Sequence, residues 1–150
     1  MKTILNTEGA NDLSRRVNRL QQSSQPLWGT MTVTEMLHHC NRATQSILEG
    51  KAPPKQSTFK QQVLKFLFLN VIKKLPRNAT APKRFNVKLS QLVPGKFENE
   101  RNEFLNLIER FTKHEDNITL SHPRFGALKT REWGKFVWMH LDHHLRQFGV

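Results

Sequence analysis

The sequence is poor in cysteine and has no leader-like N-terminus. Cys40 is the only cysteine among 150 residues, so no internal disulfide can form and the class of disulfide-rich secreted proteins is excluded. A lone thiol fits a reducing, cytoplasmic setting. The first eight residues contain no apolar stretch of the kind that signal peptides need, and we therefore expect no signal peptide.

Long apolar runs are also missing. In the most apolar segment, residues 57–75, the uninterrupted apolar run extends only from Phe66 to Leu69, whereas a membrane-spanning helix needs about 20 such residues. The mean hydropathy of −0.61 likewise excludes an integral membrane protein. We expect this segment to form a helix that is buried on most sides, and we expect no membrane partner.

Acidic residues are scarce relative to basic ones. The chain has 12 Asp and Glu against 24 Lys and Arg, for a formal net charge of +12. RNA, DNA, acidic lipid or a small anionic substrate would all fit this charge equally well. Zinc-finger spacing, an RNP-like aromatic motif and a glycine-rich phosphate loop are all absent from the sequence. A positively biased surface is therefore favoured over specific nucleic-acid binding.

Helical periodicity dominates the rest of the chain. Thr32 and Glu35 form a capping box, and Gly50 is expected to end the same helix in a left-handed conformation. The expected helices cover residues 11–22, 32–50, 57–75, 98–113 and 130–148. Residues 77–95 predict a long irregular connection with a short extended piece at 85–89, and residues 122–126 predict a turn. The sequence thus indicates an all-α single domain over residues 1–150, with four long helices and a shorter N-terminal one.

Two histidines of the last expected helix lie in the middle of its apolar stripe. At about 100° per residue, His140 and His144 fall about 20° on either side of Trp133. Two imidazoles at positions i and i+4 on an inward face can present their nitrogens to one divalent transition metal. The alternative is a pair of core histidines that bond to backbone or to each other, although each such imidazole keeps a donor and an acceptor out of water.

A third ligand must come from another helix. In the helix that begins after Thr32, His39 lies at the edge of the apolar arc, Cys40 points inward and His38 faces solvent by the same arithmetic. His39 and Cys40 are therefore both open as ligands, although a buried cysteine is more often a small hydrophobe. His122 is expected to bond within a loop or to line the rim of a site. His114 is expected to complement a helix C-terminus.

Three imidazoles on one ion leave a position open for water or substrate, which is the pattern of catalytic sites. The run from His140 to His144 lacks the Glu that zinc proteases carry directly after the first His, so that class is excluded. Asp142 is expected on the outer face of its helix and is a poor general base there. His143, at the boundary of the apolar stripe, is the better candidate for supporting a ligand or transferring a proton.

Five short motifs give the sequence a family likeness. They are PLWGTMT at 26–32, MLHHC at 36–40, HPRFGAL at 122–128, EWG at 132–134 and HLDHHLRQFG at 140–149. These motifs resemble the DUF1569 family, which is related to the DinB/YfiT-like four-helix metalloproteins. The resemblance implies a DinB-like four-helix bundle, here with a short extra N-terminal helix and a long irregular connection before the third or fourth bundle helix. It also implies a divalent metal on His39, His140 and His144, with zinc and nickel both compatible.

Relatives in the wider superfamily include thiol-dependent S-transferases, in which the metal activates a low-molecular-weight thiol. We therefore expect a cytoplasmic, metal-dependent transferase or hydrolase that acts on a small thiol-bearing or anionic substrate. One alternative is a basic helical protein that binds nucleic acid or another acidic partner and whose His cluster is structural. Another is a domain whose metal only stabilises the fold. Homodimer formation is open, since related bundles often pair.

Overall fold

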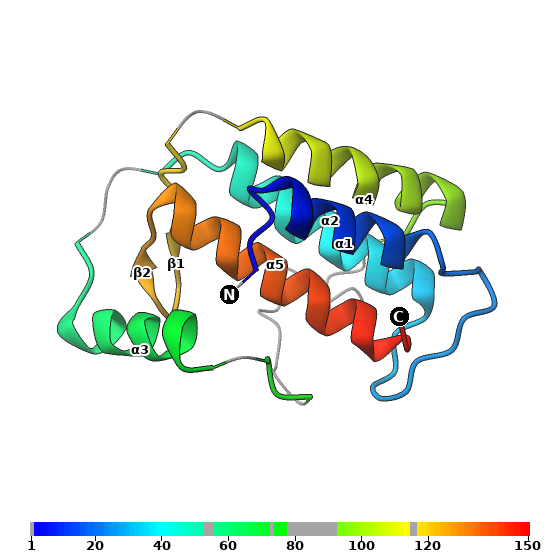
Figure 1. Ribbon diagram of the computed structural model, residues 1–150, viewed down its shortest axis with the longest axis horizontal. Coiled ribbons are helices and arrows are strands. Elements are labelled where there is room, and N and C mark those ends of the chain that lie inside the picture. Colours follow the sequence, from blue (N-terminus) through cyan, green and yellow to red (C-terminus); the bar gives the residue numbers. More distant parts are fainter. Residues whose placement is uncertain (1, 53–55, 73, 78–92, 115–116) are drawn as a thin grey trace.

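Four helices packed side by side form the body of the protein, and a fifth lies at one end (Figure 1). The computed structural model describes residues 2–52, 56–72, 74–77, 93–114 and 117–150. Its elements are α1 (Thr7–Val17), α2 (Val33–Glu49), α3 (Phe59–Asn70), α4 (Phe97–Thr112), β1 (Ser121–His122), β2 (Gly126–Ala127) and α5 (Thr130–Gln147). The expected all-α class is confirmed, with one small antiparallel hairpin added to it.

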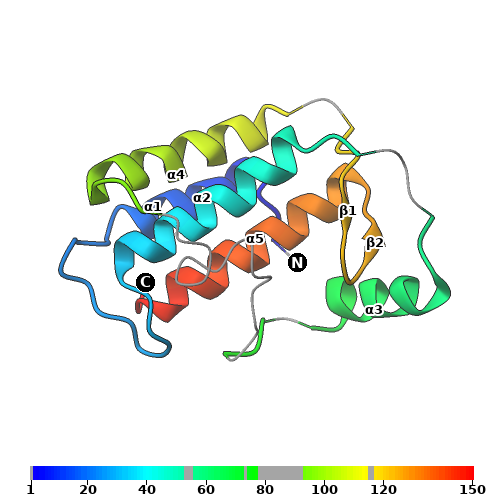
Figure 2. The same cartoon turned by 180° about the vertical axis from the view of Figure 1, so that it is seen from behind.

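The core lies between α1, α2, α4 and α5. Helices α1 and α2 each pack against both α4 and α5, and the largest fully buried side chains come from these contacts. Among them are Met36, Phe104, Phe111, Trp133 and Leu145. The N-terminal helix is therefore part of this packed set and not an addition to it. The additional helix is α3, whose main described contacts are with α5 and the hairpin (Figure 2).

Helix α1 begins earlier than the periodicity predicted. The side chain of Asn6 accepts a hydrogen bond from the backbone nitrogen of Gly9 at 2.8 Å and caps the helix. Gly9 is needed in this first turn because a Cβ there would lie 1.9 Å from the carbonyl oxygen of Thr3. The predicted start at residue 11 was wrong because a cap, and not the first apolar residue, fixes where the helix begins.

Helix α2 begins as predicted and ends for a different reason. The backbone nitrogen of Thr32 donates to Glu35 at 2.7 Å, and the nitrogen of Glu35 donates to the Thr32 hydroxyl at 3.2 Å, which confirms the capping box. Gly50 follows the last turn, but its φ of −69° is not left-handed. What Gly50 supplies is space, since a Cβ there would lie 2.3 Å from the carbonyl oxygen of Ser46.

The expectation of a helix buried on most sides at 57–75 was wrong. Helix α3 covers only Phe59–Asn70, and within it only Phe68 and Leu69 are buried. Phe59 is 82% exposed and Phe66 is 62% exposed. The apolar run predicted burial, but the body of the protein is already complete without α3, so only one side of α3 meets it.

The remaining segments connect these elements. The expected turn at 122–126 is the tip of the β1–β2 hairpin, where Gly126 has a φ of +68°. The expected extended piece at 85–89 lies outside the described residues. Among the helices that the structure describes, none has the length and apolarity needed to cross a bilayer.

Candidate metal centre

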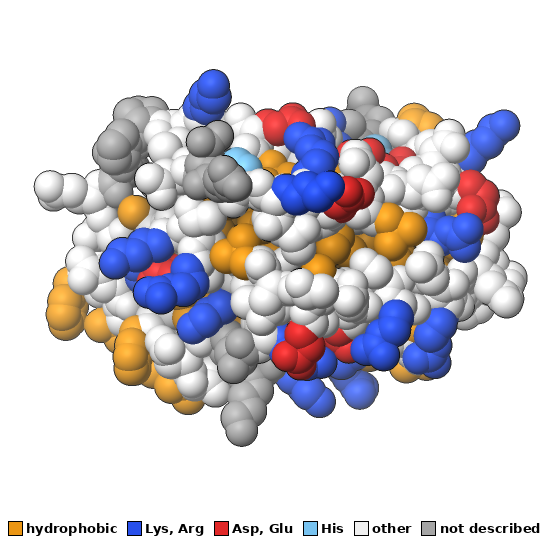
Figure 3. All heavy atoms as spheres, turned by 45° about the horizontal axis from the view of Figure 1, so that its top comes forward, with side chains coloured by type: hydrophobic (Ala, Val, Ile, Leu, Met, Phe, Trp, Pro, Cys, Tyr) orange, Lys and Arg blue, Asp and Glu red, His pale blue; other side chains and the backbone are white. Residues whose placement is uncertain are grey.

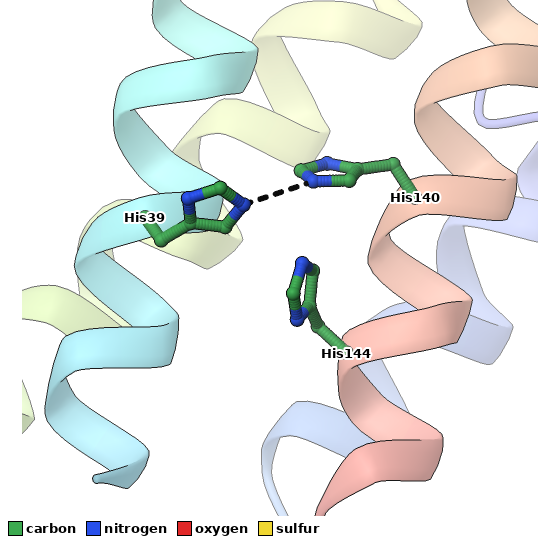
Figure 4. Close-up of side chains that lie close together, drawn as sticks. All are labelled: His39, His140 and His144. Atoms are coloured by element: carbon green, nitrogen blue, oxygen red, sulfur yellow. Dashed lines mark hydrogen bonds between the residues drawn. The ribbon is translucent and has the colours of Figure 1, made fainter. Parts of the chain in front are cut away.

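Three histidine side chains meet between α2 and α5 (Figure 4). His39 comes from the middle of α2, and His140 and His144 come from successive turns of α5. Their candidate ligand nitrogens all lie within 4.8 Å of one another, and the Nε2 atoms of His39 and His140 are 3.1 Å apart. The structure thus brings together the three residues that helix-face arithmetic and the family resemblance indicated.

The donor set fits a divalent transition metal. Two nitrogens bound to a tetrahedral ion at about 2.0–2.1 Å lie about 3.4 Å apart, which is close to the 3.1 Å between His39 and His140. The third nitrogen lies within 4.8 Å of the other two, and a side-chain rotation would bring it closer. Among the described residues, no other group of three His, Cys, Asp or Glu side chains meets in this way.

Burial keeps the imidazoles of His140 and His144 neutral. The pKa of His144 falls from 6.5 to about 3, first because burial disfavours the charged form and then because His39 lies beside it. The pKa of His140 is also well below its ordinary value, through burial and then through His144 and His39. A metal therefore does not have to compete with a proton for these nitrogens at neutral pH.

Gln147 holds His144 from behind. Its side-chain nitrogen donates to the carbonyl oxygen of Trp28 at 2.7 Å, so its side-chain oxygen faces Nδ1 of His144 at 3.0 Å. A carbonyl oxygen can only accept, and Nδ1 of His144 must therefore carry the proton. The lone pair is left on Nε2, the atom that points toward His39 and His140 (Figure 4).

The loop that contains Leu27, Trp28 and Gly29 fits closely around Gln147. Gly29 has a φ of +80°, and a Cβ there would lie 2.6 Å from the side-chain nitrogen of Gln147. The backbone nitrogen of Leu27 also donates to the carbonyl oxygen of Gln147 at 2.7 Å. Sequence reasoning missed Gln147, although its place three residues after His144, on the same side of α5, was a usable signal.

His143 lies next to the cluster without being part of it. Its ring contacts the rings of His144, at a centroid distance of 5.0 Å, and Trp28, at 5.9 Å. The side chain is buried, and its Nδ1 has no hydrogen-bond partner among the described residues. Burial, and then the nearby Arg146, lowers the pKa of His143. The ring of Trp28 contacts this side chain, which is buried in a way that its position on the helix could not show.

His38 does not face solvent as predicted. Helix α4 covers it, and its Nδ1 lies 2.8 Å from a carboxylate oxygen of Glu100. The same carboxylate accepts hydrogen bonds from Asn41 and from the backbone nitrogen of Gly95, both at 2.8 Å. The face angle was correct in placing His38 away from His39, but it could not show that another helix packs there.

Cys40 and Asp142 are both excluded from the cluster by their surroundings. Cys40 is fully buried against the sulfur of Met36 at 3.8 Å, and burial raises the pKa of its thiol, which disfavours the thiolate that metals bind. Asp142 was predicted on the outer face but is buried against α1. Its carboxylate binds Arg16 at 2.9 Å and Arg146 at 2.8 Å, so it remains a poor general base.

The other two histidines considered lie outside the cluster. Nδ1 of His122 accepts from the backbone nitrogen of Arg124 at 3.1 Å, which confirms a loop hydrogen bond. Its ring packs at 4.8 Å on Phe136, whose ring is stacked at 6.1 Å on His140, so His122 approaches the cluster through one aromatic side chain. His114 lies beyond the end of α4, where its ring faces Phe111.

Comparison with known proteins places the chain in one family. No curated protein and no solved structure gives a match. A family model described as "Protein of unknown function (DUF1569)" matches residues 2–149, which is nearly the whole chain. The chain therefore belongs to the DUF1569 family.

Proposed function

We propose that this protein has a DinB-like fold and binds one divalent transition metal, zinc or nickel, through His39, His140 and His144. The observation that carries the proposal is the buried cluster itself, in which His140 and His144 are neutral and the Gln147 contact fixes the tautomer of His144. Three imidazoles that converge on one point inside the protein suit a cation, because each can offer it a nitrogen lone pair.

The proposed activity is that of a metal-dependent transferase or hydrolase. An ion on three imidazoles supplies a Lewis acid with one position free for water or a thiol. The chain contributes the rest: Gln147 orients His144, and Nδ1 of His143, buried and without a partner among the described residues, can receive a proton from the reacting group. A reducing, cytoplasmic setting is part of this proposal, since it keeps both Cys40 and a thiol substrate reduced.

The substrate class follows from charge and from the family likeness. A formal net charge of +12 attracts a small anionic molecule. A low-molecular-weight thiol is the substrate that the thiol-dependent enzymes of the wider DinB-like superfamily would suggest. The two properties are compatible, because many such thiols also carry carboxylates.

Elemental analysis of protein purified without chelator tests the proposal. We expect about one divalent ion per chain, and loss of that ion in His140→Ala and in His144→Ala. His114→Ala is the matched control, because it removes an imidazole outside the cluster and should retain the metal. Metal-free protein, both as purified and after incubation with zinc or nickel, would remove the proposal.

A second arm of the same experiment tests the thiol. Protein loaded with cobalt(II) should change its visible absorption when a low-molecular-weight thiol is added, because sulfur enters the free position. His114→Ala should behave as the unaltered protein. A spectrum that no thiol or small anion changes would show that the ion only stabilises the fold. Nucleic-acid binding that survives His140→Ala would instead favour the alternative function.

A further inference from the structure

Helix α3 carries most of the exposed hydrophobic surface of the described chain. Nine large hydrophobic side chains are exposed among the described residues, and seven of them lie between residues 59 and 72. Soluble proteins rarely expose so many apolar side chains on one element unless that element binds something. These side chains appear at the α3 end of the molecule, the lower left in Figure 3.

The opposite side of α3 is firmly attached. Phe68 packs on Phe125 and Phe136, with ring centroids 4.6 Å and 5.9 Å apart. Lys65 donates to the carbonyl oxygen of Ala127 and pairs with Glu132, both at 3.2 Å. These contacts fix the rotation of α3, so the direction of its outer side chains is a property of the fold.

The outer side forms one continuous apolar face. At about 100° per residue, Phe59, Val63, Phe66 and Leu67 fall within an arc of about 100°, and all four are exposed by 41% or more. The helix is thus apolar on both sides, with one side turned to the protein and the other turned away from it.

The charged residues described near α3 are mostly basic. Within α3 itself the charged residues are Lys60 and Lys65, and this helix has no Asp or Glu. The neighbouring hairpin and the segment after it add exposed Arg124 and Lys129. Glu132, the acidic residue on this side of α5, is already paired with Lys65.

We propose that the outer face of α3 binds the surface of an anionic lipid bilayer. A basic helix with exposed Phe, Val and Leu lies in the plane of the lipid headgroups, with its apolar side chains among the acyl chains and its cations against the anionic headgroups. A second copy of the chain suits the face less well, because two helices with a positive charge and no acidic residue would be brought together. The expectation of no membrane partner rested on the lack of a membrane-spanning run, which binding at the bilayer surface does not need. The positive charge left acidic lipid open as a partner.

Binding of the full chain to lipid vesicles tests this proposal. We expect sedimentation with vesicles that contain phosphatidylglycerol, little binding to vesicles of phosphatidylcholine alone, and weakening as salt is raised from about 0.05 M to about 0.5 M. Phe59→Ser combined with Phe66→Ser should lower the partition coefficient about tenfold or more, because two apolar side chains no longer enter the bilayer. Both residues are largely exposed, so the variant should fold.

Two matched controls separate the face from general effects. Leu27→Ser removes a side chain that is 70% exposed at the other end of α5, and it should leave vesicle binding unchanged. Lys60→Glu should weaken binding more than Arg19→Glu, which makes the same change of charge at the far end of α1. Equal binding to neutral and anionic vesicles, or unchanged binding of the double variant, would overturn the proposal. A second result would also overturn it. In that case the unaltered protein would form a dimer in sedimentation equilibrium, the double variant would be a monomer, and neither would bind vesicles.

Discussion

Gln147 shows how one side chain can decide which atom of a neighbour is available to a metal. Its amide is polarised by the carbonyl of Trp28 on one side and accepts from Nδ1 of His144 on the other. Partners of this kind fix the tautomer and direction of a metal ligand and are worth about 10–100-fold in metal affinity. Gln147 bonds the nitrogen of His144 that does not face the other two histidines. It therefore affects a metal through His144 and is not itself a candidate ligand.

Gln147→Leu should therefore lower metal affinity by about 10–100-fold without removing a ligand. The Leu side chain fills the same space but cannot accept from Nδ1, which frees the imidazole to change tautomer. Gln147→Glu keeps the acceptor and should stay nearer to the unaltered protein. Competition with a chromophoric chelator measures both affinities. Equal affinities for the Leu and Glu variants would show that packing, and not the hydrogen bond, is what Gln147 provides.

At this scale the sequence predicted which histidines meet better than it predicted what surrounds them. Helix-face angles placed His39, His140 and His144 correctly, because the apolar stripe of each helix marks the side that meets the core. The same angles failed for His38 and Asp142, since a polar side chain can face a second helix instead of water. A single-helix argument has no information about α4 or α1, which cover these two residues.

At the scale of elements, Glu100 ties α4 to α2. Burial alone would raise the pKa of this carboxyl group, but hydrogen bonds from Gly95, His38 and Asn41 favour the charged form and bring the pKa below its ordinary 4.5. A carboxyl group whose pKa is lowered by folding stabilises the protein above its unfolded pKa. That contribution disappears as the pH falls through the lower, folded value.

Glu100→Gln should accordingly destabilise the protein at pH 7 by about 1–3 kcal/mol, because it loses charge-assisted hydrogen bonds and leaves His38 with a weaker partner. The difference from the unaltered protein should shrink as the pH falls below 4.5, where Glu100 itself becomes protonated. Urea unfolding across this range measures it. Glu98→Gln, at an exposed residue of the same helical turn, is the control and should cost little. A difference that does not change with pH would contradict this account.

Element boundaries and exposure were less predictable than element type. The capping box at Thr32 was predictable because both of its hydrogen bonds are local. Whether α3 is buried depends on how much of its surface the other helices cover. A local sequence pattern has no information about that. Phe68 and Phe66 are the same residue type two positions apart, yet one is buried and the other is exposed.

At the scale of the whole molecule, the histidine cluster joins two helices that are far apart in the sequence. His39 and His140 are separated by 101 positions in sequence, and α2 and α5 also enclose much of the core. An ion held by both helices binds only the folded chain, because the unfolded chain rarely brings these imidazoles together. The proposed metal binding would therefore be coupled to folding.

Removal of the proposed metal should lower the thermal stability even though the core remains complete. At a free metal concentration about 100 times the dissociation constant, the stabilisation is about 2.7 kcal/mol, which for a chain of this size corresponds to roughly 5–10 °C in Tm. Calorimetry before and after chelation, with zinc then added back, measures the shift. His144→Ala should show no response to zinc while still unfolding cooperatively, because Trp133, Phe104 and the other core side chains are untouched. A Tm that chelation leaves unchanged in the unaltered protein would mean that the three imidazoles are held together by packing alone.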